Sequence, residues 1–369
     1  MPDAPASEAT APLAPKTRFH FVDLFRGLLM AHMALDHVSL FWNAGRFAKE
    51  YAHERPPLPA GFWQFLTRFT GVFVAPGFSF MAGFMIAVTS ERRAGRGLDE
   101  GVITRRLLLR GLILILAEQI LLTMGRFHFE VLSCLGVCMM ILALARRAPA
   151  WALLAASVAI MALHPLLDVS RLPFPLAQIL HDPRDVGKWH ALYPVIPWLG
   201  VMLFGFVCGR DFQRNPKAAG RWALWAAAFA ALFLAVRLPA GFGNAFPYER
   251  VASYEFFIWA KYPPDLAWLT WSFMTVFALL ALLLRFQDSR ALDSAPAHFL
   301  AAFGRVPFFF YLVHFLLLGS LAYFILPEFH LPLWGVFAAW AALLLLLGWP
   351  CRAYYAYKRS HPESVWRYL

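Results

Sequence analysis

Charged residues are scarce in this 369-residue chain, because Asp, Glu, Lys and Arg together make up 15% of it. Soluble domains contain about 25% charged residues. Hydrophobic residues make up 60% of the chain, more than one soluble core could bury. The composition therefore excludes a soluble dinucleotide-binding fold, a coiled coil and a disordered chain, and it predicts a polytopic membrane protein.

Cysteine is also rare, and the four residues of this type lie in or beside apolar runs: Cys134, Cys138, Cys208 and Cys351. None has the spacing to histidine that is typical of metal sites, so we expect no bound metal. A polar connection that contains His181, Asp182 and His190 is a weaker alternative, because such a connection must be polar in any case.

The N-terminus lacks the basic segment and apolar core of a secretory signal peptide. Residues 1–17 are rich in Ala and Pro, and we expect a disordered tail there. Residues 18–357 should form one transmembrane domain and residues 358–369 a cytoplasmic C-terminal tail. A bacterial inner membrane is the simplest expected location.

Acidic residues are outnumbered, and the net charge is +11. Such an excess is compatible with nucleic-acid binding, but here the arginines lie between apolar stretches. This placement is typical of membrane topology signals and of contact with anionic lipids. We therefore expect lipids as partners and no nucleic acid, and we leave open whether the chain forms a homo-oligomer.

The apolar runs predict an all-α bundle of about ten transmembrane helices, because one span needs about 20 mostly apolar residues. The ten candidates are 20–42, 63–90, 106–124, 129–146, 150–167, 191–210, 221–238, 265–285, 301–325 and 333–354. If both termini are cytoplasmic, about two thirds of the basic residues fall on the cytoplasmic side. The long connections 43–62, 168–190 and 239–264 then all face outside.

The first span is unusual because it carries five ionisable residues: Asp23, Arg26, His32, Asp36 and His37. A charged group near the bilayer centre costs about 2.5–3.5 kcal/mol, so these side chains should face a hydrated cavity within the protein. At 100° per residue, Asp23, Arg26 and His37 share one helix face, with His32 and Asp36 on another.

Simpler roles are open for the same residues. Asp23 and Arg26 could form a structural ion pair at the inner interface, and His37 could be an interfacial histidine that hydrogen-bonds a neighbouring helix. Arg26 and His37 are separated by about 16 Å along the axis at 1.5 Å per residue. Arg26 would thus lie toward the cytoplasm and His37 toward the outer end of one cavity.

The segment RFHFVDLFRGLLMAHMALDHVSLF resembles the opening helix of the heparan-α-glucosaminide N-acetyltransferase catalytic-domain family, a group of transmembrane acyltransferases. The positions that match its Arg, Asp-x-x-Arg-Gly and Asp-His pattern are Arg18, Asp23, Arg26, Gly27, Asp36 and His37. Segments similar to the bacterial branch of this family follow in order at 66–83, 193–209, 261–268 and 303–315. The resemblance therefore covers nearly the whole chain.

This resemblance implies an integral membrane acetyltransferase that moves an acetyl group from cytoplasmic acetyl-CoA to an amino or hydroxyl group of a saccharide or envelope glycan. It implies that His37 is catalytic, either as a general base or as an acetyl acceptor. Asp36 is the second catalytic candidate. Because Asp36 lies 100° from His37 in projection, we favour a partner for His37 from another helix.

The phosphates of acetyl-CoA would need cationic donors at the inner end of the cavity. The candidates for binding this donor are Arg26, Asp23, Arg305, Arg105 and Arg106. The candidates for binding the acceptor are Arg68, His314 and Trp198. Each has a plainer alternative, since cytoplasmic loops are basic and tryptophans often face lipid.

A proton-coupled secondary transporter of a small metabolite is the alternative function, because buried Asp, Arg and His also suit proton coupling. Two features count against it: the sequence has no detectable internal repeat, and its ionisable residues are concentrated in one helix. The acceptor, the choice between N- and O-acylation and the existence of an acetyl-histidine intermediate stay open.

Overall fold

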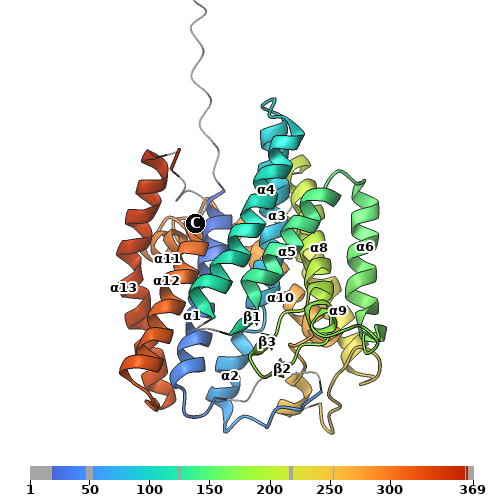
Figure 1. Ribbon diagram of the computed structural model, residues 1–369, viewed down its shortest axis with the longest axis vertical. Coiled ribbons are helices and arrows are strands. Elements are labelled where there is room, and N and C mark those ends of the chain that lie inside the picture. Colours follow the sequence, from blue (N-terminus) through green and yellow to red (C-terminus); the bar gives the residue numbers. More distant parts are fainter. Residues whose placement is uncertain are drawn as a thin grey trace, which may run out of the picture.

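The computed structural model describes residues 19–46, 53–123, 126–215, 219–251, 253–361 and 363–364, and these ranges are mainly helical (Figure 1). The helices are α1 (His20–Trp42), α2 (Phe62–Thr70), α3 (Val74–Ala94), α4 (Glu100–Ala117), α5 (Val131–Ala145), α6 (Ala150–Leu163), α7 (Leu176–Leu180), α8 (Val195–Arg214), α9 (Ala219–Arg237), α10 (Leu266–Arg285), α11 (Ala295–Arg305), α12 (Pro307–Ser320) and α13 (Leu333–Ser360). Two π-helical segments, η1 (Glu118–Leu122) and η4 (Leu321–Ile325), extend α4 and α12. The expected tail at 1–17 and Arg18 of the opening motif lie outside the described residues.

Helices fill most of each of the ten predicted segments. Among the described residues, six helical stretches are long and apolar enough to cross a membrane: Phe62–Ala94, Val195–Arg214, Ala219–Arg237, Leu266–Arg285, Pro307–Ile325 and Leu333–Ser360. Apolar α5 and α6 are shorter. A helical membrane protein is thus confirmed, whereas the count of ten and the cytoplasmic termini stay predictions.

Two predicted spans are interrupted. The segment 63–90 is divided between α2 and α3, with a turn at residues 71–73. The segment 301–325 is divided between α11 and α12, and Pro307 is the first residue of α12. Proline has no backbone N–H and is favoured in the first turn of a helix, so it begins a new helix at this position. The helix α13 also continues to Ser360, into the expected C-terminal tail.

A small sheet, absent from the all-α prediction, lies beside the bundle at the lower end in Figure 1. Its strands are β1 (Phe127–Phe129), β2 (Asp185–Val186) and β3 (Trp189–Ala191). Strand β3 lies in the middle, parallel to β1 and antiparallel to β2, and it pairs His128 with His190. Strands of two or three residues are too short to show the alternating pattern that identifies a strand.

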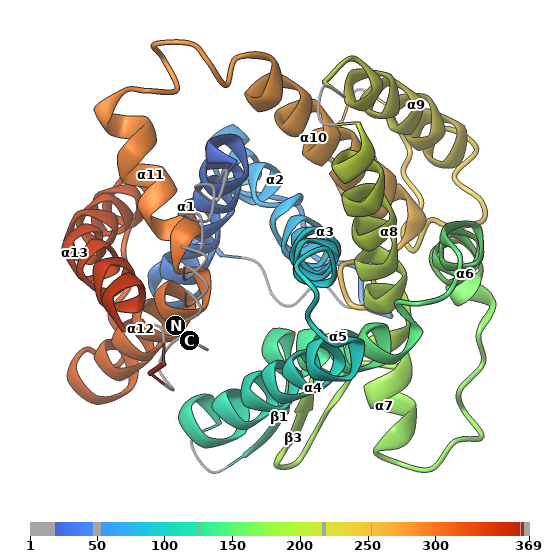
Figure 2. The same cartoon turned by 90° about the horizontal axis from the view of Figure 1, so that it is seen from above.

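Helix α1 lies at the centre of one half of the bundle, where it packs against α11, α12 and α13 (Figure 2). The approach to α11 is very close. A Cβ atom added to Gly27 would collide with the backbone carbonyl of Leu300, and one added to Gly304 would collide with that of Asp23. Small residues allow membrane helices to approach in this way. The contact brings Arg305, at the end of α11, next to the first turns of α1.

Candidate active site

A cavity of about 1170 Å³ lies at the end of the bundle where α1 ends, and we call it the main cavity. Its wall includes the last turns of α1 and residues from all three long connections, 43–62, 168–190 and 239–264. The structure thus brings together the three connections that we expected on one side of the membrane. That this side faces outward stays a prediction.

Helix α1 presents Asp36, His37, Leu40 and Phe41 to the main cavity. This spacing of one, four and five residues places the four side chains on one face of the helix. His32 lies one turn deeper in the helix and does not line the cavity. Its Nδ1 donates to the carbonyl of Leu28 at 3.2 Å, and its ring packs against Phe73 at 5.4 Å. The expected patch of His32 with Asp36 is therefore divided, and only Asp36 reaches the cavity.

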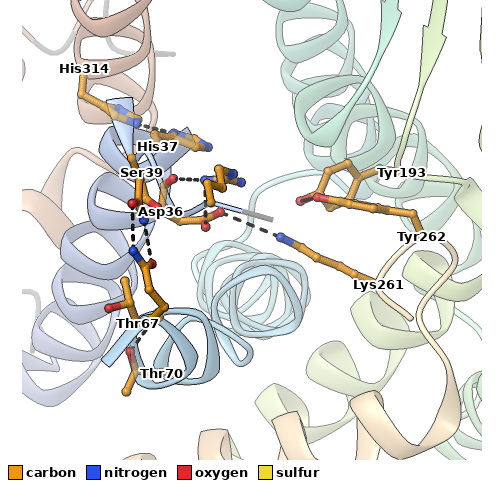
Figure 3. A network of polar contacts seen from close by, with 12 residues as sticks. Asp36, His37, Ser39, Thr67, Thr70, Tyr193, Lys261, Tyr262 and His314 are labelled. Carbon is orange, nitrogen blue, oxygen red and sulfur yellow. Dashed lines mark hydrogen bonds and ion pairs between the residues drawn. The ribbon is translucent and has the colours of Figure 1, made fainter. Parts of the chain in front are cut away.

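His37 forms a hydrogen bond with His314 of α12, with 2.8 Å between His37 Nδ1 and His314 Nε2 (Figure 3). The two rings are nearly parallel, at 5°. His314 Nδ1 in turn donates to the carbonyl of Phe310 at 2.7 Å. We expected His314 to bind substrate, but it is 0% exposed and lies behind His37. It therefore contacts His37 directly, and its role in binding the acceptor stays a prediction.

Asp36 faces two cations of the cavity wall. Its Oδ1 lies 3.5 Å from Nη1 of Arg46, which also donates to the backbone carbonyl of Asp36 at 2.6 Å. Its Oδ2 lies 4.0 Å from Nζ of Lys261 (Figure 3). The carboxylate thus holds two segments of the rim against the end of α1. The contact expected of a group that orients His37 is made by His314.

The wall opposite α1 carries paired polar groups. His190 Nε2 and Glu130 Oε1 are 2.7 Å apart, and both residues line the cavity. The hydroxyl oxygens of Tyr193 and Tyr262 lie 3.4 Å apart and point toward the Asp36 side in Figure 3. This wall therefore offers acidic, imidazole and phenolic groups to a ligand in the cavity.

Arg237, the last residue of α9, fixes the shape of the third connection. Its guanidinium is 0% exposed and makes hydrogen bonds of 2.8–3.1 Å within this connection. The acceptors are the carbonyls of Phe246, Glu255, Phe256 and Ile258 and the side chain of Asn244. Because the donor in every one of these hydrogen bonds is a charged guanidinium, the bonds are strong and hold the connection in place. We call this set of bonds the Arg237 clamp. The clamped segment leads directly to Lys261 and Tyr262.

Asp265 secures the other side of this segment and caps α10. Its Oδ1 accepts from the backbone N–H of Trp268 at 2.8 Å. Its Oδ2 accepts from the backbone N–H groups of Ala245 and Ala260, each at 3.1 Å. The cap satisfies an N–H group that has no partner within the helix. Lys261 thus lies on backbone that is held from both ends.

Glu118, in η1, is 1% exposed. Its carboxylate accepts from the backbone N–H groups of Glu130, Leu132 and Ser133, at 3.0–3.1 Å. These N–H groups belong to the first turn of α5 and its cap, where the helix dipole favours a negative charge. Glu118 therefore positions Glu130 on the cavity wall.

Two further acceptor-binding candidates have different surroundings. Arg68 lines the main cavity, and its Nη1 donates to the carbonyl of Phe257 at 3.3 Å. Trp198 is 2% exposed and does not line the cavity. Its ring packs behind two cavity residues, Tyr193 at 5.2 Å and Trp268 at 5.8 Å. Trp198 thus supports two residues of the cavity wall, and its contact with an acceptor stays a prediction.

A second, smaller pocket of about 160 Å³ lies toward the other end of α1, and we call it the basic pocket. Four cations line it: Arg26 of α1, Arg110 of α4, Arg305 of α11 and Lys358 of α13. Asp23 is the acidic neighbour, with 3.8 Å between its Oδ2 and Nε of Arg305.

The basic pocket divides the arginines that we expected to bind the donor. Arg26 and Arg305 line the pocket, whereas Arg105 and Arg106 do not, although they lie on the same helix as Arg110. Because Arg105 and Arg110 are five residues apart, they point about 140° away from each other around α4. Of these three arginines of α4, only Arg110 lies on the helix face that lines the basic pocket.

The described residues contain no group of three potential ligands that could hold a metal. The histidines of the second connection have other partners. His181 Nε2 lies 3.1 Å from Nδ1 of His164, and burial lowers the pKa of His181 despite the nearby Asp182. His190 is paired with Glu130. The polar character of this connection thus reflects internal contacts.

The sequence argument gave no role to Arg46, Glu130, Lys261 or Tyr262, all of which line the main cavity. Lys261 and Tyr262 lie within a block that resembles the family, and this block was the available signal. Arg46 lies in a connection and Glu130 at the first turn of a predicted span, 129–146, and a charge is ordinary at both kinds of position. Only their position in space distinguishes them.

The model of the family described as "Heparan-alpha-glucosaminide N-acetyltransferase, catalytic" matches residues 18–241. The match covers more than half of the chain, and the chain therefore belongs to this family. Its membership places it among membrane acetyltransferases. No curated protein matches the chain.

Proposed function

Starting from this membership, we propose that the chain transfers an acetyl group from acetyl-CoA to an amino or hydroxyl group of a saccharide, with His37 as the general base. The observation that carries the proposal is the position of His37, which lines the main cavity and is hydrogen-bonded on its far side to His314. A neutral imidazole carries a lone pair that can accept a proton and later release it, which suits a general base.

The donor would bind with its phosphates in the basic pocket. Coenzyme A carries a pyrophosphate and a 3′-phosphate, and arginine forks bind such groups through two parallel hydrogen bonds. Three arginines and a lysine converge there from four helices. The pocket and His37 lie along one helix, so a donor held at its phosphates would direct its thioester toward the main cavity.

In the proposed step, Nε2 of His37 accepts a proton while the acceptor nitrogen or oxygen forms a bond to the acetyl carbonyl carbon. The carbon–sulfur bond then breaks, and the coenzyme A thiolate receives the proton from His37. In a second version of the step, His37 itself carries the acetyl group between donor and acceptor. Both versions need an unprotonated nitrogen of His37 that faces the cavity.

The acceptor would occupy the main cavity. Paired Glu130 and His190 can accept and donate hydrogen bonds to sugar hydroxyls, and so can the hydroxyls of Tyr193 and Tyr262. These groups support a saccharide or envelope glycan as acceptor, which fits a protein in a bacterial inner membrane.

The test compares His37→Gln with a matched histidine substitution, His32→Gln, in the purified protein. Both residues lie on α1, but only His37 lines the cavity. We measure coenzyme A release and acetylation of glucosamine-terminated and hydroxyl-bearing saccharides. His37→Gln should lower turnover at least about 100-fold, the usual contribution of a general base, and His32→Gln should change it little.

Near-normal turnover in His37→Gln would overturn the proposed role of this histidine. A second measurement addresses the whole function. Saturating acetyl-CoA should raise the unfolding temperature of the purified protein, because a ligand that binds only the folded state stabilises it. If acetyl-CoA has no effect while a transported metabolite does, the proposal fails in favour of the transporter.

A further inference from the structure

The hydrogen bonds around His37 determine which of its nitrogens carries a proton. The chain of bonds begins at the carbonyl of Phe310, which can only accept, so Nδ1 of His314 must be the donor over their 2.7 Å contact. A neutral imidazole has one N–H group. Nε2 of His314 therefore carries a lone pair, and it accepts.

The partner of this lone pair is Nδ1 of His37, at 2.8 Å, which must then carry the proton. The opposite arrangement, with the proton on Nε2 of His37, would place two lone pairs against each other. It could be repaired only by protonating His314, which is 0% exposed. A buried charge without a compensating partner is strongly unfavourable.

We propose that His314 is a positioning residue that holds His37 in the Nδ1–H tautomer and thereby keeps the lone pair of Nε2 available to the main cavity. Nδ1 is turned toward α12, so Nε2 lies on the opposite side of the ring (Figure 3). The inference rests on the proposed function for its catalytic consequence, but the tautomer itself is a property of the resting protein.

The packing around the two rings supports this role. Tyr311 and Phe315, one turn apart on α12, both meet the His37 ring edge-on, at 6.2 and 5.1 Å. The rings restrict rotation of His37 about its side-chain bonds. A protonated His37 would still donate from Nδ1 to His314, so the same contact serves both states of a proton-transfer cycle.

The test uses two amide substitutions of His314, each of which can replace the hydrogen bond of only one of its two ring nitrogens. His314→Gln places an amide oxygen near the position of Nε2, where it can accept from His37. His314→Asn is shorter and replaces only the Nδ1 side, so it keeps the bond to the Phe310 carbonyl and loses the bond to His37. We expect His314→Asn to lower kcat about 100-fold, the lower end of what a general base contributes, with KM nearly unchanged. His314→Gln should retain most of the lost rate.

Equal loss in the two variants, or wild-type kcat in His314→Asn, would overturn the role. A spectroscopic measurement tests the tautomer without any turnover. In protein labelled with ¹⁵N-histidine, the ring nitrogens of His37, assigned by their loss in His37→Gln, should report a proton on Nδ1. A proton on Nε2 would refute the inference. If wild-type protein transfers no acetyl group, the proposed function fails, while the tautomer is still decided by this spectrum.

Discussion

The basic pocket allows a sharp test of where the donor binds. Arg110 lines the pocket, whereas Arg105 is an exposed arginine on another face of the same helix. Substituting each by glutamine removes one positive charge from α4, and arginine and glutamine have similar helix propensities. The pair therefore separates loss of charge in general from loss of charge at the pocket.

The expected size follows from the kind of bond. A hydrogen bond to a charged group contributes about 1.5–3 kcal/mol, which corresponds to about 10- to 150-fold in affinity. Arg110 is exposed at the rim of the pocket, so solvent screening places the effect at the lower end. We expect Arg110→Gln to raise the KM for acetyl-CoA about tenfold and to leave kcat nearly unchanged.

The assay compares two acetyl donors: acetyl-CoA and S-acetylpantetheine, which has the same thioester and no phosphates. Arg110→Gln should weaken the use of acetyl-CoA only, and Arg105→Gln should affect neither donor. The difference between Arg110 and Arg105 should shrink at high salt, because screening weakens exposed charges. An equal rise in KM for both donors, or equal effects of the two substitutions, would refute binding of phosphate in the pocket.

Three further predictions concern the frame of the site. Arg237→Met removes the donors that hold the third connection, so the protein should lose about 3–5 kcal/mol of stability and unfold at a lower temperature; unchanged unfolding would contradict the clamp. Gly304→Leu should force α1 and α11 apart and weaken acetyl-CoA binding more than Gly220→Leu, since an added Cβ meets the backbone of Asp23 at Gly304 and open space at Gly220. Burial lowers the pKa of His181, so the folded state favours the neutral ring. Its contribution to stability is therefore present above pH 6.5 and is lost as the pH falls below this value. Below pH 6.5 the unfolding temperature of the wild type should fall more steeply with pH than that of His181→Gln, and above it the two should change in parallel.

The helices could be predicted because long apolar runs have few alternatives in a membrane, where backbone polar groups must be satisfied within the segment. The first helix was the clearest case, and α1 extends from His20 to Trp42 as the run indicates. Helix breaks were harder. The turn between α2 and α3 lies inside an apolar run, and the break before Pro307 depends on which helix turn the proline occupies.

A residue of the candidate site could be predicted only where it interrupts an apolar segment, because burying a polar group in a membrane costs free energy. His37 and Arg26 are conspicuous because each interrupts an apolar segment, and helix geometry places them about 16 Å apart on nearby faces. Both line pockets in the structure. Lys261, by contrast, lies in a connection that must be polar whatever its function, and Glu130 lies at the edge of a predicted span, where a charge is ordinary. A charge there carries no energetic signal in the sequence.

The partner of His37 shows why some features of the site can be predicted from the sequence and others cannot. His314 interrupts an apolar run as His37 does, so each histidine could be identified as a residue in need of a hydrogen-bond partner. Their pairing joins positions 277 residues apart and depends on how α12 packs against α1, which in turn follows from the contact between α11 and Gly27. The need for a partner is thus local and visible in the sequence, whereas the choice of partner is made by the packing of glycine-bearing helix faces.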